Sequence, residues 1–321
     1  MVRILANDGI HPDGKTLLEE AGYEVDTQKV PQEKLAEALQ NYDVLVVRSA
    51  TKVRKELIDQ CPHLKIVCRG GVGLDNIDVE HARSKGITVF NTPAASSQAV
   101  AELAFGHMFG MARFLNQSNR LMASSGSTIF DKLKKDYAEG VQLRGKTLGI
   151  IGFGRIGQAV ARIGLGLGMN VLPADVIIDE ADIDLTLFKT SEVRLSVTVE
   201  VSDFDTVISK SDFITLHVPF SGGKPLIGAE ELAKMKKGVF IVNTARGGAI
   251  DEKALLEALN SGKVAGAGLD VFENEPTPML ELLQHPRVSL SPHIGAATIE
   301  AQSYIGMELA EKIISFYGDD K

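Results

Sequence analysis

Short apolar runs bounded by turn residues alternate along the whole chain with stretches of helical spacing. Asp251–Leu259 shows the helical pattern best, because Asp251 can cap its start, apolar residues share one face and Gly262 can end it. Apolar strands separated by helices are typical of parallel sheets covered on both faces. The pattern therefore predicts two doubly wound α/β domains. The expected strands are Val2–Ala6, Asp43–Val47, Lys65–Cys68, Ile87–Phe90, Thr147–Ile151, Asn170–Leu172, Asp212–Val218, Gly238–Asn243, Val264–Leu269 and Val288–Ser291.

The chain is expected to cross between the two domains at two places. A helix beginning near Ser97 leads out of the first set of strands. The segment Pro292–Gly295 precedes a last amphipathic helix, roughly Thr298–Phe316, which we expect to dock back on the first domain. The predicted domains are a discontinuous outer domain of residues 1–98 and 295–321 and an inner domain of residues 99–294.

Composition narrows the classes of function. Of the 321 residues, 42 are acidic and 34 basic, and the net charge of −8 disfavours a general nucleic-acid surface. Cys61 and Cys68 lack the spacing of a disulfide framework or a metal site. The longest apolar stretch, Ala99–Leu115, contains charged residues and predicts a buried helix, and the N-terminus lacks signal-peptide architecture. We therefore expect a soluble, cytoplasmic protein without a metal ion, a membrane anchor or a nucleic-acid partner.

A glycine pattern follows one predicted strand, at Gly152, Gly154 and Gly157. The spacing G-x-G-x-x-G between a strand and a helix is typical of dinucleotide binding. The first glycine permits a tight turn, the second lets the backbone approach a pyrophosphate, and the third lets helix and strand pack closely. The amides of Arg155 and Ile156 would then point at phosphate from the start of the helix.

An acidic residue supports this interpretation. Asp175 lies eighteen residues after the last glycine of the pattern, at the end of the next predicted strand. Its carboxylate can accept hydrogen bonds from a ribose and would repel a 2′-phosphate, so NAD is favoured over NADP. Pro173 removes a backbone donor from a strand that should be internal. We expect that strand to end early, with Asp175 already beyond the sheet.

Polar residues follow three later strands, in the runs Asn243–Gly248, Asp270–Pro276 and Ser291–Gly295. In a doubly wound sheet these strand ends face the ligand crevice. Hydride transfer to a 2-keto acid needs a cation for the carbonyl and carboxylate and a proton donor that titrates near neutrality, which arginine and histidine supply. Together with Asp175 and the run Leu216–Pro219, these motifs resemble the D-isomer-specific 2-hydroxyacid dehydrogenases over nearly the whole chain.

The resemblance implies an NAD-dependent oxidoreductase acting on a small molecule, with a Rossmann NAD-binding inner domain and a flavodoxin-like substrate-binding outer domain. It implies that Arg246 binds the substrate carboxylate and carbonyl, that His293 exchanges a proton with the substrate hydroxyl, and that Glu275 holds the imidazole in its charged form. A homodimer is also implied. The residues implied to line the nicotinamide side are His217, Pro219, Thr244, Ala245 and Asp270.

Two loops of the outer domain bear on the substrate. Residues 69–78 are similar to the family's carboxylate loop, whose backbone amides hold the substrate carboxylate. The run RSATKV is closer to the 3-phosphoglycerate dehydrogenase branch, and an arginine there suits a phosphate because its fork can bind two oxygens. The alternative is a solvated arginine at a strand end. The substrate-binding candidates are Arg48, Ser49, Gly71, Val72 and Gly73.

The chain departs from that branch in two segments. It has no tryptophan, and in place of a tryptophan-led basic segment it carries Lys132, Lys134 and Lys135, which are candidates for phosphate binding. An acidic stretch, roughly Asp179–Arg194, is longer than the family pattern predicts near the adenosine end. Alternating valines after this stretch predict a short third strand: Val197, Val199 and Val201.

The resemblance favours oxidation of D-3-phosphoglycerate to 3-phosphohydroxypyruvate, a step of serine biosynthesis. Three alternatives stay open: a glyoxylate/hydroxypyruvate reductase, another 2-hydroxyacid dehydrogenase, and an NAD-sensing scaffold like the corepressors that share the fold. The chain stops at Lys321, soon after the closing helix, so we expect no regulatory domain and no feedback by serine through one.

Overall fold

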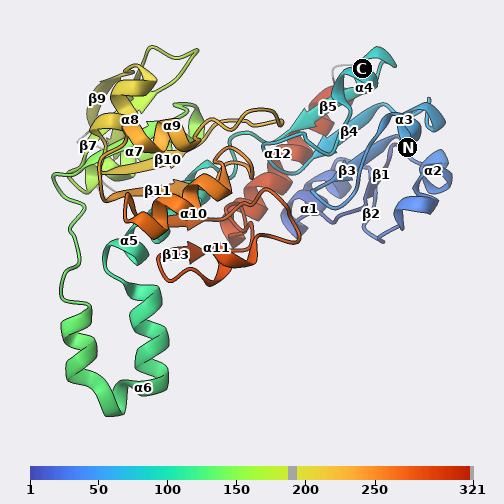
Figure 1. Cartoon of the computed structure of the whole chain (residues 1–321). Helices are drawn as coiled ribbons and strands as arrows, with labels where there is room; N and C mark the ends of the chain where they lie inside the picture. The colour runs from blue at the N-terminus through green and yellow to red at the C-terminus, as the bar shows by residue number, and fades with distance from the viewer. Residues whose placement is uncertain (187–193, 319–321) are drawn as a thin grey trace. The chain divides into compact units, whose positions relative to one another are not determined.

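The computed structural model describes residues 1–186 and 194–318. The chain divides into two compact units: unit 1 is Met1–Ala99 with Ala296–Lys321, and unit 2 is Val100–Gly295. These limits differ by one residue from the domain limits expected from the sequence. Each unit has a parallel sheet flanked by helices (Figure 1), which confirms the predicted class of two doubly wound α/β domains.

Unit 1 is built, within the described residues, on a five-stranded parallel sheet in the order β2-β1-β3-β4-β5. This is the strand order of flavodoxin-like folds. Successive side chains of a strand point to opposite faces, so Leu5 and Ile4 pack into different core clusters. The strands are β1 (Arg3–Ala6), β2 (Glu24–Asp26), β3 (Val44–Val47), β4 (Ile66–Arg69) and β5 (Thr88–Asn91).

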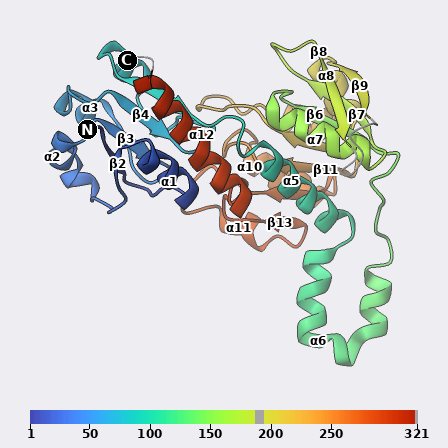
Figure 2. The same ribbon diagram turned by 180° about the vertical axis from the view of Figure 1, so that it is seen from behind.

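Two helices of unit 1 pack closely against each other, α1 (Pro12–Glu20) and α12 (Ile299–Gly318). A Cβ placed on Gly14 would lie 2.3 Å from the carbonyl oxygen of Gly306, so the backbones approach as only glycine allows. This contact joins the last helix of the chain to the first (Figure 2). The remaining helices of unit 1 are α2 (Leu35–Ala38), α3 (Lys55–Gln60) and α4 (Val79–Ser84), with 3₁₀ turns at Gln32–Lys34 and Leu39–Asn41.

The described part of unit 2 contains a six-stranded parallel sheet in the order β13-β12-β11-β10-β6-β7. Ile150 and Ile151 of its strand β6 pack into core clusters on opposite faces, which explains why the strand is apolar throughout. The strands are β6 (Thr147–Ile151), β7 (Asn170–Ala174), β10 (Phe213–Leu216), β11 (Val239–Asn243), β12 (Val264–Leu269) and β13 (Val288–Leu290).

Strand β7 differs from the expectation for Pro173. The strand runs to Ala174, and Pro173 stands opposite Ile150 of β6. Because β7 is the edge of this sheet, the missing N–H of proline costs no ladder hydrogen bond. The expectations of an internal strand and an early end were therefore wrong. Asp175 does lie just beyond the strand.

The predicted third strand is present, but it lies outside the six-stranded parallel sheet. Residues of this region form an antiparallel hairpin of β8 (Glu180–Thr186) and β9 (Arg194–Glu200), which is a separate two-stranded sheet in the described structure. Val199 is buried in the core on the side of helix α7 (Arg155–Gly166). The acidic stretch thus supplies half of a hairpin. Residues 187–193 of the stretch lie outside the described residues.

Helix α6 (Leu115–Asp136) extends away from the sheet of unit 2 in both views (Figures 1 and 2). It bends at Ile129, whose φ of −127° and ψ of 28° are not helical. Leu121, Met122 and Phe130 are exposed on it. The other helices of unit 2 are α8 (Phe204–Lys210), α9 (Ala229–Lys234), α10 (Glu252–Ser261) and α11 (Leu280–Gln284), and α5 (Ser97–Ala112) leads into the unit.

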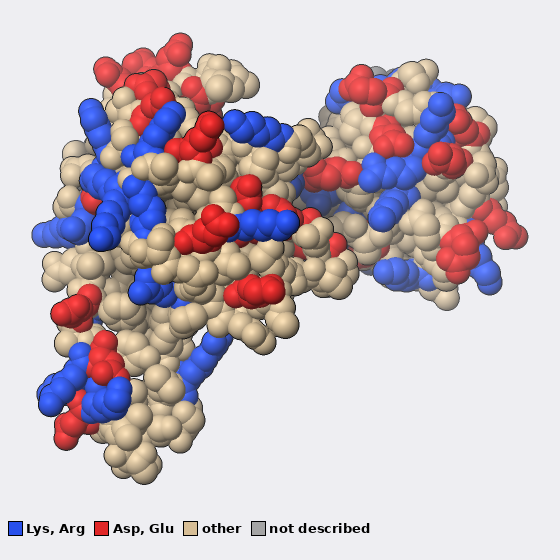
Figure 3. Space-filling view, in the orientation of Figure 1, with Lys and Arg blue, Asp and Glu red and all other residues tan. Residues whose placement is uncertain are grey.

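Lysines and arginines are interspersed with acidic residues on the face that Figure 3 shows, without an extended basic patch there. Among the described helices, none is long and apolar enough to cross a membrane. In the same residues, no group of three or more His, Cys, Asp or Glu side chains could hold a metal ion. Cys61 and Cys68 are both buried free thiols.

Candidate active site

The glycine pattern forms a tight turn between β6 and α7. Gly152 has a φ of 95°, and a Cβ on it would lie 2.6 Å from the carbonyl oxygen of His217. A Cβ on Gly157 would lie 2.1 Å from the Gly152 oxygen, so the helix crosses the strand end as closely as glycine permits. Gly154 precedes the first residue of α7 and faces open space. The first N–H groups of α7, from Arg155 and Ile156, have no acceptor within the helix and can bind an anion.

Asp175 is tied to this turn by its carboxylate. Oδ2 accepts a hydrogen bond of 2.6 Å from the N–H of Phe153, and Oδ1 accepts from the N–H groups of Ile177 and Ile178. Burial works against the charge, but these backbone donors outweigh it and hold the pKa of Asp175 below its ordinary value. The residue is therefore a carboxylate at neutral pH and stands beside the glycine turn.

Arg246 belongs to a turn at the end of β11. The Asn243 side chain fixes the turn, because its Oδ1 accepts from the N–H of Ala245 and its Nδ2 donates to the carbonyl of Arg246. A Cβ on Gly247 would lie 1.8 Å from the oxygen of Phe272, so the turn is pressed against the segment that leads to Glu275. The first and second polar runs of the sequence are thus brought together.

Glu275 and His293 form a pair. Oε2 of Glu275 lies 2.8 Å from Nδ1 of His293, and Oε1 accepts from the N–H of Phe272. Because Nδ1 faces the carboxylate, Nε2 is the ring nitrogen left to exchange a proton with a substrate. His293 has a left-handed φ of 56°, which is uncommon for a residue with a side chain, so its loop must be held by other contacts.

Asp270 supplies those contacts. Its Oδ1 accepts from the Oγ of Ser291 at 2.6 Å and from the N–H of Ile294 at 2.8 Å, while Oδ2 accepts from the N–H of Gly295 at 2.9 Å. The residue is 1% exposed. The sequence predicted Asp270 as a cofactor residue, and the structure places its carboxylate under the loop that carries His293.

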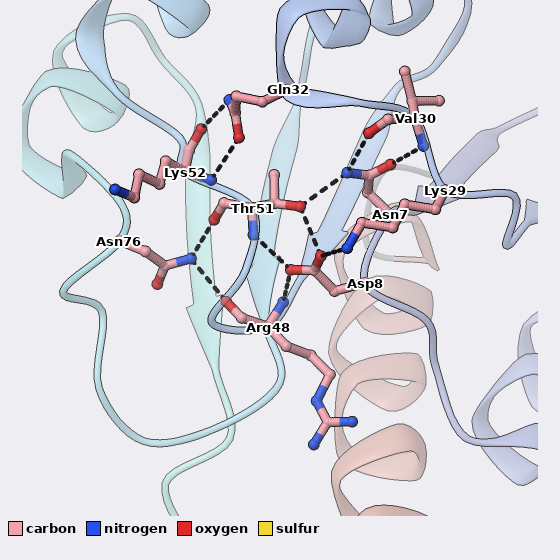
Figure 4. A network of polar contacts seen from close by, with 9 residues as sticks. All are labelled: Asn7, Asp8, Lys29, Val30, Gln32, Arg48, Thr51, Lys52 and Asn76. Atoms are coloured by element: carbon pink, nitrogen blue, oxygen red, sulfur yellow. Dashed lines mark hydrogen bonds and ion pairs between the residues drawn. The ribbon is translucent and has the colours of Figure 1, made fainter. Parts of the chain in front are cut away.

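In unit 1, Arg48 and Ser49 lie on the loop after β3, which a buried carboxylate holds (Figure 4). The Oδ2 of Asp8 accepts from the N–H groups of Arg48 and Thr51, and its Oδ1 accepts from the Thr51 hydroxyl. Asn76 donates to the carbonyl oxygens of Arg48 and Thr51, both at 2.7 Å. Asp8 thus binds N–H groups of this loop and Asn76 binds its carbonyl oxygens, while the Arg48 side chain is exposed and points away from the network.

The Arg48 side chain lines two neighbouring cavities of unit 1, of about 160 and 320 Å³. The larger is also lined by Lys29 and Ser49. Gly70 lines the smaller one, whereas Gly71, Val72 and Gly73 lie further along the same loop. The side chains of Asn91 and Thr92, which end β5 and follow it, hold this loop. Thr92 Oγ1 accepts from Gly71 N–H at 2.8 Å, and Asn91 donates to the carbonyl of Val72.

Comparison with known proteins identifies the family. The sequence profile of the D-isomer specific 2-hydroxyacid dehydrogenase NAD binding domain matches residues 105–295. Hydroxypyruvate reductase of Thermotoga maritima is 44% identical over 321 residues, covering 98% of this chain and 98% of that protein. This chain belongs to the D-isomer-specific 2-hydroxyacid dehydrogenases.

Other relatives of this 2-hydroxyacid dehydrogenase differ in length and substrate. D-3-phosphoglycerate dehydrogenase of Methanocaldococcus jannaschii is 45% identical over 315 residues, but these are 98% of this chain and only 57% of that protein. The solved structure of a glyoxylate reductase from Paecilomyes thermophila matches with a TM-score of 0.82 at 32% identity, covering 98% of this chain and 94% of that one. These relatives belong to one family but are named for different substrates.

NAD(H) is the cofactor of this 2-hydroxyacid dehydrogenase, and the residues of unit 2 fit it. Two buried polar atoms at strand ends have no hydrogen-bond partner within the described residues: Nδ1 of His217 and Oγ1 of Thr244. Both residues were predicted to line the nicotinamide side, and such orphaned atoms are suited to the polar groups of a bound ligand. Burial lowers the pKa of His217 to about 3, so this histidine is neutral and does not rival His293 as the acid. Ala245 is buried beside Thr244, and Pro219 is exposed after β10.

Several residues of the dehydrogenase escaped the sequence analysis. Asp8 follows a predicted strand, and that position could have indicated a role, but its bond to the loop after β3 spans forty residues. Lys29 has no local signal, whereas Asn76 and Asn243 lie in segments that the sequence singles out without indicating a role for either side chain. Lys132 is the one basic candidate of α6 for which an ion pair is described, with Asp136 four residues further on.

Proposed function

We propose that the protein oxidises D-3-phosphoglycerate to 3-phosphohydroxypyruvate with NAD, as a step that supplies serine biosynthesis. The observation that carries the proposal is the exposed guanidinium of Arg48 beside Lys29 in the larger cavity of unit 1. Two cations at the carboxyl ends of parallel strands suit a substrate with a phosphate in addition to its carboxylate. The neighbouring carboxylate of Asp8 accepts hydrogen bonds from the loop that carries Arg48 and pairs with Lys29 Nζ at 3.9 Å, which leaves the guanidinium of Arg48 for a ligand.

The proposed chemistry assigns one task to each residue of unit 2. NAD, held by the glycine turn and beside His217 and Thr244, would supply the acceptor for the hydride on C2 of the substrate. Arg246 binds the carboxylate and the C2 oxygen, and His293 Nε2 accepts the hydroxyl proton as hydride leaves. The ion pair with Glu275 at 2.8 Å stabilises the imidazolium that results. Backbone amides at Val72 and Gly73 of unit 1 are proposed to bind the substrate carboxylate, whereas the Gly71 N–H already donates to Thr92 Oγ1.

A second candidate is reduction of hydroxypyruvate or glyoxylate. It is favoured by the match to the Thermotoga maritima hydroxypyruvate reductase, which spans 98% of both chains, whereas the match to the phosphoglycerate dehydrogenase relative spans only 57% of that protein. Such substrates have no phosphate, so this candidate leaves the Arg48 guanidinium without a ligand group.

A substrate panel separates the candidates. Purified protein is assayed with NAD against D-3-phosphoglycerate, D-glycerate, D-lactate and D-malate, and with NADH against hydroxypyruvate and glyoxylate. Our proposal predicts the highest kcat/KM for D-3-phosphoglycerate among the hydroxy acids. A protein that reduces hydroxypyruvate efficiently and ignores D-3-phosphoglycerate would establish the second candidate instead.

We also propose that the protein is a homodimer assembled through α6. Phe130 is 57% exposed, and Leu121 and Met122 are exposed with it on a helix that extends from unit 2. Apolar patches of this kind are typical of interfaces. Light scattering should give twice the mass of one chain for the wild type and the mass of a single chain for Phe130→Asp. Leu280→Glu, at an exposed apolar residue of α11, is the control that stays dimeric. A monomeric wild type would contradict the assembly.

A further inference from the structure

A buried histidine of unit 2 lies outside the proposed chemistry. His107, on α5, is 4% exposed. Its Nδ1 lies 2.8 Å from the Oγ of Ser289, and its Nε2 lies 2.9 Å from the Oγ of Ser291. Both ring nitrogens thus bind hydroxyls of the chain that leads into the His293 loop.

The direction of these hydrogen bonds follows from the groups at the two ends. Ser291 donates its only hydroxyl proton to Asp270, whose carboxylate can only accept, so Ser291 must accept from His107 Nε2–H. At the other end, the amide Nδ2 of Asn116 can only donate, and it gives a hydrogen bond to Ser289 Oγ at 2.7 Å. Ser289 is therefore free to donate its own proton to His107 Nδ1. The chain of donors runs one way, from Asn116 to Asp270.

This order requires the neutral Nε2–H form of His107. Burial lowers the pKa of His107, and the opposing influence of the Asp270 charge is the smaller one. If both ring nitrogens of His107 carried protons, Ser289 Oγ would face two donors, Asn116 Nδ2 and His107 Nδ1. The hydroxyl proton of Ser289 would then have no acceptor on His107. The geometry and the burial therefore agree on one tautomer.

We propose that His107 is a positioning residue for the catalytic loop: its Nε2–H fixes the Ser291 hydroxyl on Asp270. Asp270 in turn binds the Ser291 side chain before His293 and the backbone N–H groups of Ile294 and Gly295 after it. Ser291 and Ile294 flank Pro292 and His293, and both bind the same oxygen of Asp270. The strained φ of His293 makes its orientation toward Glu275 depend on these bonds. The inference rests on the proposed role of His293 as the proton-exchanging group.

Three variants test this role. His107→Leu has a similar volume and removes both hydrogen bonds, whereas His107→Gln keeps an N–H donor near the place of Nε2. Met108→Ala removes a side chain that is fully buried on the same helix and controls for general destabilisation. Neither of the two positions is among the proposed substrate-binding or cofactor-binding residues.

The first readout is steady-state kinetics with whichever hydroxy acid of the panel the wild type oxidises. We expect His107→Leu to lower kcat at least ~10-fold with little change in KM or in NADH affinity, and His107→Gln to recover most of the loss. Met108→Ala should lose thermal stability and keep its kcat. Equal kcat in wild type and His107→Leu, or equal losses in the leucine and glutamine variants, would overturn the positioning role.

The second readout does not depend on activity. In protein with ¹⁵N-labelled imidazoles, His107 should show a protonated Nε2 and a bare Nδ1, and His107→Leu should shift the His293 ring signals while Met108→Ala leaves them in place. An Nδ1–H tautomer of His107, or His293 signals unchanged in His107→Leu, would contradict the inference. A wild type that oxidises none of the panel would contradict the proposed function instead, and these spectra would still decide the role of His107.

Discussion

At the scale of single residues, three carboxylates organise the loops that carry the candidate site. Asp8 binds the loop of Arg48, Asp175 binds the glycine turn, and Asp270 binds the loop of His293. In each case the oxygens accept backbone N–H groups at strand ends, where an unpaired N–H would otherwise be costly. The same residue type therefore sets backbone geometry at three places, while the chemistry belongs to their neighbours.

Asp175 should decide the choice of cofactor. Burial opposes its charge, but backbone hydrogen bonds outweigh burial and lower its pKa, so Asp175 is charged at neutral pH and repels a 2′-phosphate there. We expect NADH to bind at least ~10-fold tighter than NADPH, equivalent to about 1.4 kcal/mol. Asp175→Asn should narrow the difference. Fluorescence titration measures both affinities, and equal values for the wild type would remove Asp175 from cofactor selection.

His293 and Glu275 should have separable effects on the rate. His293→Ala should lower kcat roughly 10²–10⁴-fold, the usual weight of a general acid–base group. In the reductive direction the imidazole must be charged, and Glu275→Gln removes the anion that stabilises the charge. The reductive rate of this variant should therefore start to fall at lower pH than that of the wild type. If the pH–rate profile of Glu275→Gln is the same as that of the wild type, Glu275 does not stabilise the charged form of His293.

At the scale of elements, the alternation of apolar and polar residues predicts most of the fold. Strands β6 and β12 have the predicted bounds, and α10 has Asp251 as its cap and Gly262 at its end with a φ of 72°. The prediction failed at β7 and β9, because an apolar alternation does not reveal whether a strand joins the parallel sheet or pairs with its sequence neighbour. Edge position is decided by tertiary packing.

The sequence predicts the motif residues of the candidate site but not the residues that hold them in place. The turns with Gly152, Asp175 and His293 follow from motifs, since their chemistry requires particular residue types at fixed spacing. Asp8, which holds the loop of Arg48, and His107, which binds the segment leading to His293, act across 40 and 182 positions of the chain and have no local pattern. Supporting contacts of this kind depend on which strand ends meet in the folded sheet.

The contact of α1 with α12 should be sensitive to a single methyl group. Gly14→Ala should lower the free energy of unfolding by about 1–3 kcal/mol, because the new Cβ overlaps the Gly306 backbone and the helices must separate. Gly166→Ala is the matched control, since residue 166 is helical and faces open space, and it should be neutral or stabilising by up to about 1 kcal/mol. Urea denaturation measures both, and equal effects would contradict the close packing.

At the scale of the whole molecule, the two units supply different parts of one proposed function. Unit 2, which the family profile matches at residues 105–295, carries the glycine turn and the pair of Glu275 and His293. Unit 1 carries the loop of Arg48 and its cavity, which we propose to recognise a substrate phosphate. The proposed function therefore assigns the choice of substrate to unit 1 and the reaction to unit 2.

The measurement that tests this account most directly compares two substrates in two variants. D-Glycerate has the carboxylate and hydroxyl of D-3-phosphoglycerate without the phosphate. Arg48→Ala should lower kcat/KM for D-3-phosphoglycerate by about 1.5–3 kcal/mol of transition-state binding and leave the low value for D-glycerate nearly unchanged. Lys52→Ala, at a lysine that does not line the cavity, should change neither. If Arg48→Ala lowers kcat/KM for both substrates by the same factor, Arg48 does not recognise the phosphate, and the assignment to D-3-phosphoglycerate is wrong.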